Sequence, residues 1–330
     1  MPQPKSPDYR LGILYSLATA ALYATQEPFS FPAAKHLNTI QFVCLTQISL
    51  FVSIPLVTGH ASARRDLIAL LRDRSNYGPL AVVFGVGLSG LLLYNLGLSH
   101  AHPIIISAIL NLSPFWAALV ALLIAEVPIP VSPTVFFGCF AGAFAGAMVV
   151  AWSQLDANKA DLAGLASDLV HGTWIYAIPV PLCSALGGTL INRWFGRYRD
   201  SAAVAANFLF ANVILIPATL LILAARGELD FGHEIVALLL MVVGTTIAGS
   251  VGRIFYQVAL TVTRGDNGFV MMFLNLVPAL TAVISLALSL WIADLHFVID
   301  GMFLTGSALI AASLFLFSLR SPRQPAQPSS

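Results

Sequence analysis

Long apolar stretches that alternate with short polar ones dominate the chain and indicate its structural class. A helix that crosses a bilayer needs about 20 mostly apolar residues. The pattern predicts ten such helices, over residues 11–33, 39–58, 79–99, 103–125, 134–152, 172–193, 202–224, 235–259, 268–291 and 298–319. The longest connectors are 59–78 and 153–171, and the polar, proline-rich segment 321–330 predicts a disordered tail. We therefore expect an all-α integral membrane protein with ten transmembrane helices.

Composition narrows the functional class. Of the 330 residues, 58% are hydrophobic and 9% are charged, and the mean hydropathy is +0.85, whereas a soluble globular domain carries roughly a quarter charged residues. A soluble enzyme is therefore excluded as the default class, and a net charge of +1 without a basic face argues against nucleic-acid binding. Cys44, Cys139 and Cys183 stand in apolar runs, and the sequence has no metal-ligand spacing, P-loop or nucleophile–base pair. We expect no enzyme activity, metal or cofactor.

The distribution of Lys and Arg predicts the orientation. With the N-terminus inside, the inner segments hold Lys5, Arg10, Arg64, Arg65, Arg72, Arg74, Arg193, Arg197, Arg199, Arg264, Arg320 and Arg323, and the outer segments hold only Lys35, Lys159 and Arg226. Cytoplasmic loops of membrane proteins carry such an excess of basic residues. We expect a multi-pass protein of the cell inner (plasma) membrane with both termini cytoplasmic and with the first span retained rather than cleaved.

Two short motifs occur twice in the same order. Leu-Tyr-Asn-Leu-Gly-Leu-Ser at 93–99 corresponds to Phe-Tyr-Gln-Val-Ala-Leu-Thr at 255–261, and Asn-Leu-Ser-Pro at 111–114 corresponds to Asn-Leu-Val-Pro at 275–278. The match predicts two duplicated five-helix halves, 1–152 and 153–320. Because five is odd, the second half is inverted relative to the first, which is typical of secondary transporters with a midplane site.

The stretch from Leu93 to Glu126 resembles the EamA-like branch of the drug/metabolite transporter superfamily. The shared pattern is an aromatic-rich third helix that leads into a fourth helix with Leu112-Ser113-Pro114, small residues and a final glutamate, Glu126. The second copy departs from it, because Leu290 stands where the first has Glu126. The resemblance implies two inverted five-helix repeats around a central cavity. It does not imply a substrate, since the superfamily moves amino acids, nucleotide sugars, phosphorylated sugars and cationic drugs.

Only two charges fall well inside the predicted spans, Glu27 and Arg253. Charged groups in hydrocarbon are costly and usually face a cavity or a partner. Glu27 precedes Pro28 and shares a helix face with Tyr23 and Gln26. Its carboxylate is a candidate to bind a substrate ammonium group or to exchange a proton; the alternative is a helix-end acid at the outer interface or a structural pair.

Arg253 belongs to a second polar stripe. Thr246, Ser250, Arg253 and Gln257 follow helical spacing in the eighth span. The guanidinium is a candidate to bind a substrate carboxylate or phosphate. The alternative is that Arg253 extends to the cytoplasmic headgroups or pairs with backbone carbonyls.

The repeat and the irregular sixth span supply further candidate binding residues. Tyr94 and Asn95 correspond to Tyr256 and Gln257, and Asn111 corresponds to Asn275. The sixth span holds Trp174 and Tyr176, and Pro179, Pro181, Gly187 and Gly188 predict interruptions there. These side chains line the cavity or, alternatively, form ordinary helix–helix contacts or an interfacial aromatic belt. Gly138, Gly142 and Gly146 at four-residue steps predict close helix packing, within the chain or across a dimer.

These observations together predict a secondary active transporter that works by alternating access. The best guess is export of an amino acid or a related small polar or amphipathic metabolite, with proton coupling through Glu27. The alternatives are another substrate class of the superfamily, a channel, or an intramembrane enzyme acting on lipids. The expected partners are membrane lipid, the small-molecule substrate and protons, and the expected state is a monomer or homodimer.

Overall fold

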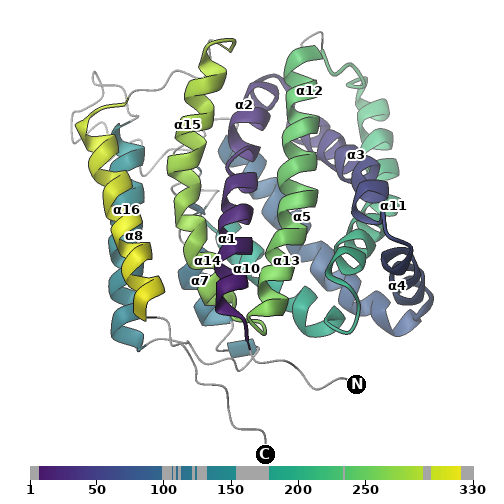
Figure 1. Ribbon diagram of the computed structural model, residues 1–330. Helices are drawn as coiled ribbons and strands as arrows, with labels where there is room; N and C mark the ends of the chain where they lie inside the picture. The colour runs from purple at the N-terminus through teal and green to yellow at the C-terminus, as the bar shows by residue number, and fades with distance from the viewer. Residues whose placement is uncertain are drawn as a thin grey trace, which may run out of the picture.

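The computed structural model describes residues 7–98, 106, 109–110, 113–120, 123–124, 132–153, 178–232, 235–292 and 299–320, and every regular element in this part is helical (Figure 1). The elements are α1 (Tyr9–Tyr23), α2 (Gln26–His36), α3 (Thr39–Val57), α4 (Ala61–Arg72), η1 (Arg74–Asn76), α5 (Tyr77–Leu98), α7 (Ser113–Val120), α8 (Pro133–Ser153), α10 (Val180–Phe195), α11 (Asp200–Arg226), α12 (Ile235–Gly244), η5 (Thr245–Gly252), α13 (Arg253–Val262), α14 (Asn267–Met272), η6 (Phe273–Leu276), α15 (Val277–Ser289) and α16 (Gly301–Arg320). The predicted all-α class is confirmed.

Six helical stretches of the described chain are long and apolar enough to cross a membrane. They are Thr39–Val57, Arg74–Leu98, Pro133–Val150, Asp200–Arg226, Ile235–Val262 and Asn267–Ser289. Each coincides with a predicted span, and Gly301–Phe317 is a shorter apolar helix at the last one. Such a set is typical of a multi-pass membrane protein. Parts of the predicted spans 103–125 and 172–193 and the tail 321–330 lie outside the described residues.

The first predicted span is not one continuous helix. It is broken between Tyr23 and Gln26 into α1 and α2, both too short to cross a membrane alone. Pro28 has no backbone N–H, so the carbonyl of Ala24 has no helical partner four residues ahead. The hydroxyl of Thr281 on α15 donates to that carbonyl at 3.3 Å. The break therefore leaves its freed backbone group hydrogen-bonded inside the protein.

Residues at the helix ends and in the connecting segments are hydrogen-bonded to one another at each end of the bundle. At one end, Asp8 N–H donates to the carbonyl of Val262, Thr261 Oγ1 donates to Asp200, and Arg197 donates to Asp73. At the other end, Asn38 Nδ2 donates to Glu228 at 2.9 Å. The first end carries Arg10, Arg64, Arg65, Arg72, Arg74, Arg193, Arg197, Arg199 and Arg264 and is called the basic end below; among the described residues, the second carries Lys35 and Arg226.

A pair of helices, α8 and α16, packs at one edge of the bundle (Figure 1). A Cβ atom on Gly146 would lie 2.6 Å from the carbonyl oxygen of Gly306, and one on Gly142 would lie 2.5 Å from Ser313 Oγ. A Cβ on Gly138 would meet no atom within 4 Å. Two of the three predicted packing glycines therefore have their partner within the chain, and the absence of side chains lets the two backbones approach.

Gly146→Ala is expected to destabilise the protein by about 1–3 kcal/mol, because the added methyl overpacks a backbone–backbone contact that has no flexible side chain to move. Thermal unfolding of the purified protein in detergent measures the effect. Gly138→Ala is the matched control in the same helix, and its midpoint should stay unchanged or rise slightly. Equal behaviour of the two variants would contradict this packing.

Candidate functional site

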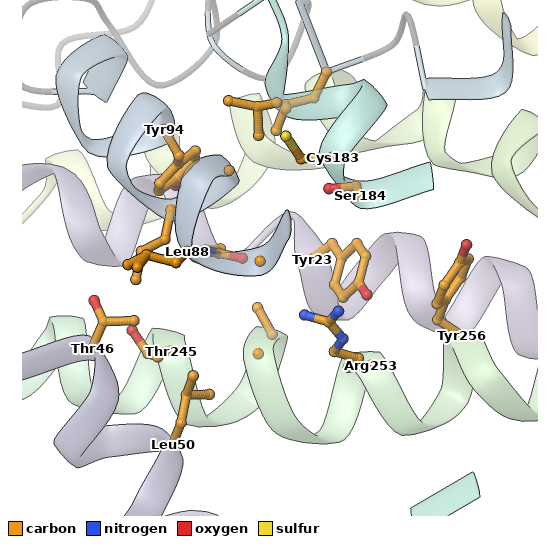
Figure 2. Close-up of a pocket in the computed structure, with 18 of the residues that line it drawn as sticks. Tyr23, Thr46, Leu50, Leu88, Tyr94, Cys183, Ser184, Thr245, Arg253 and Tyr256 are labelled. Atoms are coloured by element: carbon orange, nitrogen blue, oxygen red, sulfur yellow. The ribbon is translucent and has the colours of Figure 1, made fainter. Parts of the chain in front are cut away.

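A cavity of about 240 Å³ is lined by residues of α1, α2, α3, α5, α7, α10, α11, the η5–α13 segment and the α14–η6–α15 segment (Figure 2). Its walls come from residues on both sides of the predicted 152/153 boundary. The polar lining residues are Tyr23, Gln26, Glu27, Thr46, Gln47, Tyr94, Ser113, Cys183, Ser184, Asn207, Thr245, Arg253 and Tyr256, and the rest of the lining is apolar or glycine. A polar cavity thus lies within a bundle of apolar helices.

The structure brings together six of the residues predicted to bind a substrate: Tyr23, Gln26, Glu27, Tyr94, Arg253 and Tyr256. Asn95, Gln257 and Asn275 are buried but do not line this cavity. Asn275 Nδ2 instead donates to the carbonyl of Met272 at 2.9 Å, so part of its amide satisfies local backbone. The candidates Asn111, Trp174 and Tyr176 lie outside the described residues.

Glu27 stands at the break in the first span. It is in the first turn of α2 and is 2% exposed. The free N–H groups and the dipole of a helix N-terminus favour a negative charge there. Tyr94 on α5 is close enough to interact electrostatically with this carboxylate. The acidic side of the cavity therefore combines Glu27 with an aromatic ring from another helix.

Arg253 follows a π-helical segment, η5, which begins at Thr245 and ends at Gly252. Such segments are rare and occur frequently at functional sites. The cavity face of this segment consists of Thr245, Ala248 and Gly249. The predicted stripe is therefore corrected: Arg253 lines the cavity, but Thr246, Ser250 and Gln257 do not, and the Ser250 hydroxyl is hydrogen-bonded to Ser53 of α3. The wider π turns change the register on which that stripe was based.

The guanidinium of Arg253 lies beside the ring of Tyr23 (Figure 2). Tyr23 packs on Gly252, where a Cβ would come within 2.8 Å of the ring, so a larger residue there would displace it. Within the described part of the chain, Arg253 makes no hydrogen bond and no ion pair. The positive charge and the five N–H donors of the Arg253 guanidinium therefore remain available to an anionic ligand that binds in the cavity.

Tyr256 is held by a hydrogen-bonded network that joins three helices. Its hydroxyl donates to Asn267 Oδ1 at 2.5 Å, and Asn267 Nδ2 donates to Thr189 Oγ1 at 2.8 Å. The ring lies on Gly188, where a Cβ would come within 2.6 Å of Tyr256 Cε1. The Tyr256 hydroxyl is thus occupied structurally, and its ring supplies a wall. No sequence pattern pointed to Asn267, which lies at the start of an apolar segment.

The predicted interruptions of the sixth span are corrected for its described part. α10 is continuous from Val180 to Phe195. Pro181 lies in the first turn, where a helix does not need the missing amide. Gly187 and Gly188 are places of close approach rather than breaks, because Arg253 and Tyr256 pack against them.

Three buried polar atoms on the cavity wall have no hydrogen-bond partner among the described residues. They are Tyr94 Oη, Thr46 Oγ1 and Asn207 Oδ1, and their residues are 5%, 5% and 8% exposed. A buried donor or acceptor without a partner costs about 1–3 kcal/mol. These atoms are therefore suited to bind a polar ligand. Thr46 and Asn207 were missed, although each is a polar residue within a predicted apolar span.

A buried acid lies outside the cavity, in the turn between α13 and α14. Asp266 accepts from Phe269 N–H at 3.0 Å as the N-cap of α14, and Tyr9 Oη donates to it at 3.4 Å. The side chain is 4% exposed. Burial raises the pKa of Asp266 from 3.8 to about 7, although the two hydrogen bonds act in the opposite direction.

The stability of the protein is expected to fall as the pH rises from about 4 to about 7. The folded-state pKa of Asp266 is above its ordinary value, so the folded state binds the extra proton and loses that advantage as the pH approaches 7. Asp266→Asn keeps a capping oxygen but cannot ionise. The plot of stability against pH should therefore be flatter for this variant, and its stability at pH 8 should be higher than that of the wild type. Thermal unfolding across this pH range measures it. Asp8→Asn, at the exposed N-cap of α1, is the control and should leave the slope unchanged.

No protein-family model and no curated protein matches the chain. Among solved structures, 24 chains are similar to it. One of them is a crystal structure of a protein that is 15% identical, and the similarity covers 94% of this chain and 99% of that chain with a TM-score of 0.63. At this identity the similarity shows a shared fold over nearly the whole length of both chains.

Proposed function

We propose that the protein is a secondary active transporter of a small polar or amphipathic metabolite. Ten transmembrane helices form two inverted five-helix repeats, of the EamA-like kind, which alternate between inward-open and outward-open states around the cavity. The observation that carries the proposal is the polar cavity itself. Inside an apolar bundle it holds an arginine and three polar atoms that have no hydrogen-bond partner among the described residues. Such groups are expensive in a membrane protein and are typical of a substrate path.

The irregular backbone at the cavity supports the same function. The α1–α2 break and the π-helical η5 both adjoin the cavity. Non-helical or distorted backbone at membrane depth is tolerated where it is buried in protein or lines a water-filled cavity. Discontinuous helices also form the substrate and ion sites of many transporters. A passive scaffold has no need of either feature.

The lining supports a proposed role for each of the two charged residues. Arg253 binds a carboxylate or another anionic group of the substrate, and Glu27 binds an ammonium group or exchanges a proton. The rings of Tyr23, Tyr94 and Tyr256 line the space between them. Export of an amino acid or a related compound fits these groups best. Sugar phosphates, nucleotide sugars and cationic drugs are the other classes to be compared.

The basic end of the bundle supports the proposed orientation in the membrane. Its arginines greatly outnumber the two basic residues of the opposite end in the described chain. By the positive-inside rule the basic end is cytoplasmic, and the protein is a multi-pass protein of the inner (plasma) membrane with both termini inside.

A thermal-shift screen of amino acids, amines, sugar phosphates and nucleotide sugars is the first test. Each hit is then measured in proteoliposomes for counterflow, in which unlabelled substrate on the far side accelerates uptake of labelled substrate. A carrier shows counterflow, whereas a channel does not. Hits that bind but show no counterflow, or flux that is insensitive to trans substrate, would overturn the proposal.

A further inference from the structure

The connector 59–78 is not irregular: it folds into the amphipathic helix α4 and the short helix η1. One face of α4 is buried, with Leu70 and Ala63 0% and 3% exposed. Leu70 belongs to an apolar cluster with residues of α5, α10 and α11. Asn76 Nδ2 donates to the carbonyl of Leu70 at 2.9 Å and so fixes the end of the helix. α4 is therefore a firmly packed element of the basic end.

The opposite face of α4 carries a mixed basic and apolar stripe. Ala61, Arg65, Ile68 and Arg72 follow at i, i+4, i+7 and i+11, so they share one side of the helix, and all four are exposed. Ile68 is 50% exposed and stands between the two arginines. A large apolar side chain flanked by cations is unusual for a face that meets only water, and it is typical of helices that lie in a membrane interface.

The acidic side chains of α4 and its C-cap form ion pairs with the α10–α11 connection, whereas most of the basic side chains do not. Asp66 pairs with Arg199 and Asp73 with Arg197, so both acids are turned toward the α10–α11 connection. Arg64 donates to the carbonyls of Thr58 and Gly59 at the end of α3. The guanidinium groups of the remaining cations, Arg65, Arg72 and Arg74, make no hydrogen bond or ion pair with any residue the structure describes. The outward face is left with positive charge alone.

The position of α4 brings this face to the edge of the bilayer. The helix lies at the basic end, at the periphery of the bundle beside α11 (Figure 1). It follows directly on α3, whose last turns expose Val52 and Leu56 at 64% and 71%. Such apolar exposure on a membrane-spanning helix is directed at lipid. The chain therefore passes from a lipid-facing helix end into the α4 stripe.

We propose that α4 is an interfacial helix that binds anionic phospholipid headgroups through Arg65 and Arg72, with Ile68 inserted between the acyl chains. Charge complementarity selects the anionic headgroup, because the stripe has two cations and no acid. Arg74, in η1, lies next along the chain and adds to the positive charge. This binding does not rest on transport, and it is measured without substrate.

The test compares the wild-type protein with Arg65→Gln/Arg72→Gln in nanodiscs of phosphatidylcholine with or without phosphatidylglycerol. Native mass spectrometry of the released protein counts retained phosphatidylglycerol, and thermal unfolding reports the stabilisation that it gives. We expect the double variant to lose affinity for phosphatidylglycerol by about tenfold or more. High salt should weaken binding to the wild type and have less effect on the variant, because the lost contacts are ionic.

Two matched variants separate headgroup binding from a general effect. Arg65→Lys/Arg72→Lys keeps the charges and should retain most of the binding. Arg226→Gln removes one exposed arginine at the opposite end and should change nothing. The proposal is overturned if the double glutamine variant retains phosphatidylglycerol like the wild type, if phosphatidylcholine is retained equally, or if Arg226→Gln has the same effect. Both α4 variants replace exposed side chains without a described partner, so unfolding in phosphatidylcholine should match the wild type.

Discussion

Arg253→Gln is expected to reduce substrate affinity and transport at least tenfold. A hydrogen bond to a charged group contributes about 1.5–3 kcal/mol, which corresponds to about 10- to 150-fold in binding. Because Arg253 has no hydrogen bond with a described residue, its removal should leave thermal stability equal to or above that of the wild type. Ligand-induced thermal shift and counterflow in proteoliposomes measure the two effects on the same preparation. This combination of weaker binding and retained stability distinguishes a ligand-binding arginine from a structural one.

Two controls accompany that variant. Arg253→Lys keeps the charge but loses the planar, bidentate donor geometry, so it should recover only part of the affinity for a carboxylate or phosphate. Arg226 lies outside the cavity, so the Arg226→Gln variant should bind the substrate with the affinity of the wild type. If Arg253→Gln unfolds at lower temperature while binding the substrate with unchanged affinity, the arginine is structural.

Glu27→Gln is expected to abolish the dependence of transport on a proton gradient. Glutamine has nearly the same shape but cannot release a proton, so exchange of substrate for substrate can persist while proton-driven accumulation is lost. Uptake into proteoliposomes with and without an imposed pH gradient, compared with counterflow at symmetrical pH, separates the two activities. The position of Glu27 at the start of α2 and on the cavity wall is the reason for the expectation.

The control for this carboxylate is Glu228→Gln. Glu228 lies outside the cavity, at the end of the bundle opposite the basic end. It should leave both activities unchanged. Undiminished proton-dependent uptake by Glu27→Gln would remove the residue from proton coupling. Loss of counterflow as well would assign Glu27 to substrate binding instead, since the substrate would then no longer be held.

The all-α fold class could be predicted from the sequence because the hydrophobicity of a segment depends only on its own residues. Six predicted spans coincide with long apolar helices, since each such stretch must form its own backbone hydrogen bonds in lipid. The two charges singled out, Glu27 and Arg253, both line the cavity for a related reason, because charge in hydrocarbon is too costly to lie elsewhere.

The site was less readable wherever the backbone departs from the regular α-helix. Thr246 and Ser250 were assigned to the stripe of Arg253 on α-helical spacing, but they lie in the π-helical segment, where Thr245, Ala248 and Gly249 face the cavity instead. Thr46 and Asn207 reach the cavity only because α3 and α11 pack around it. The polar residues of these two spans follow no helical periodicity in the sequence from which these two positions could be placed.

Hydropathy and charge along the chain suffice to predict an all-helical protein with the composition of a membrane protein, and to identify the charges that require a polar environment. Three features became visible only in the folded chain: Glu27 and Arg253 share one cavity, Gly146 packs on Gly306, and the acids of α4 face the α10–α11 connection while Arg65 and Arg72 face outward. Hydrophobicity and charge act through the transfer free energy of each residue, which can be assigned from the residue type alone. Which of these residues come to lie side by side depends on helix packing between segments that are far apart in the chain.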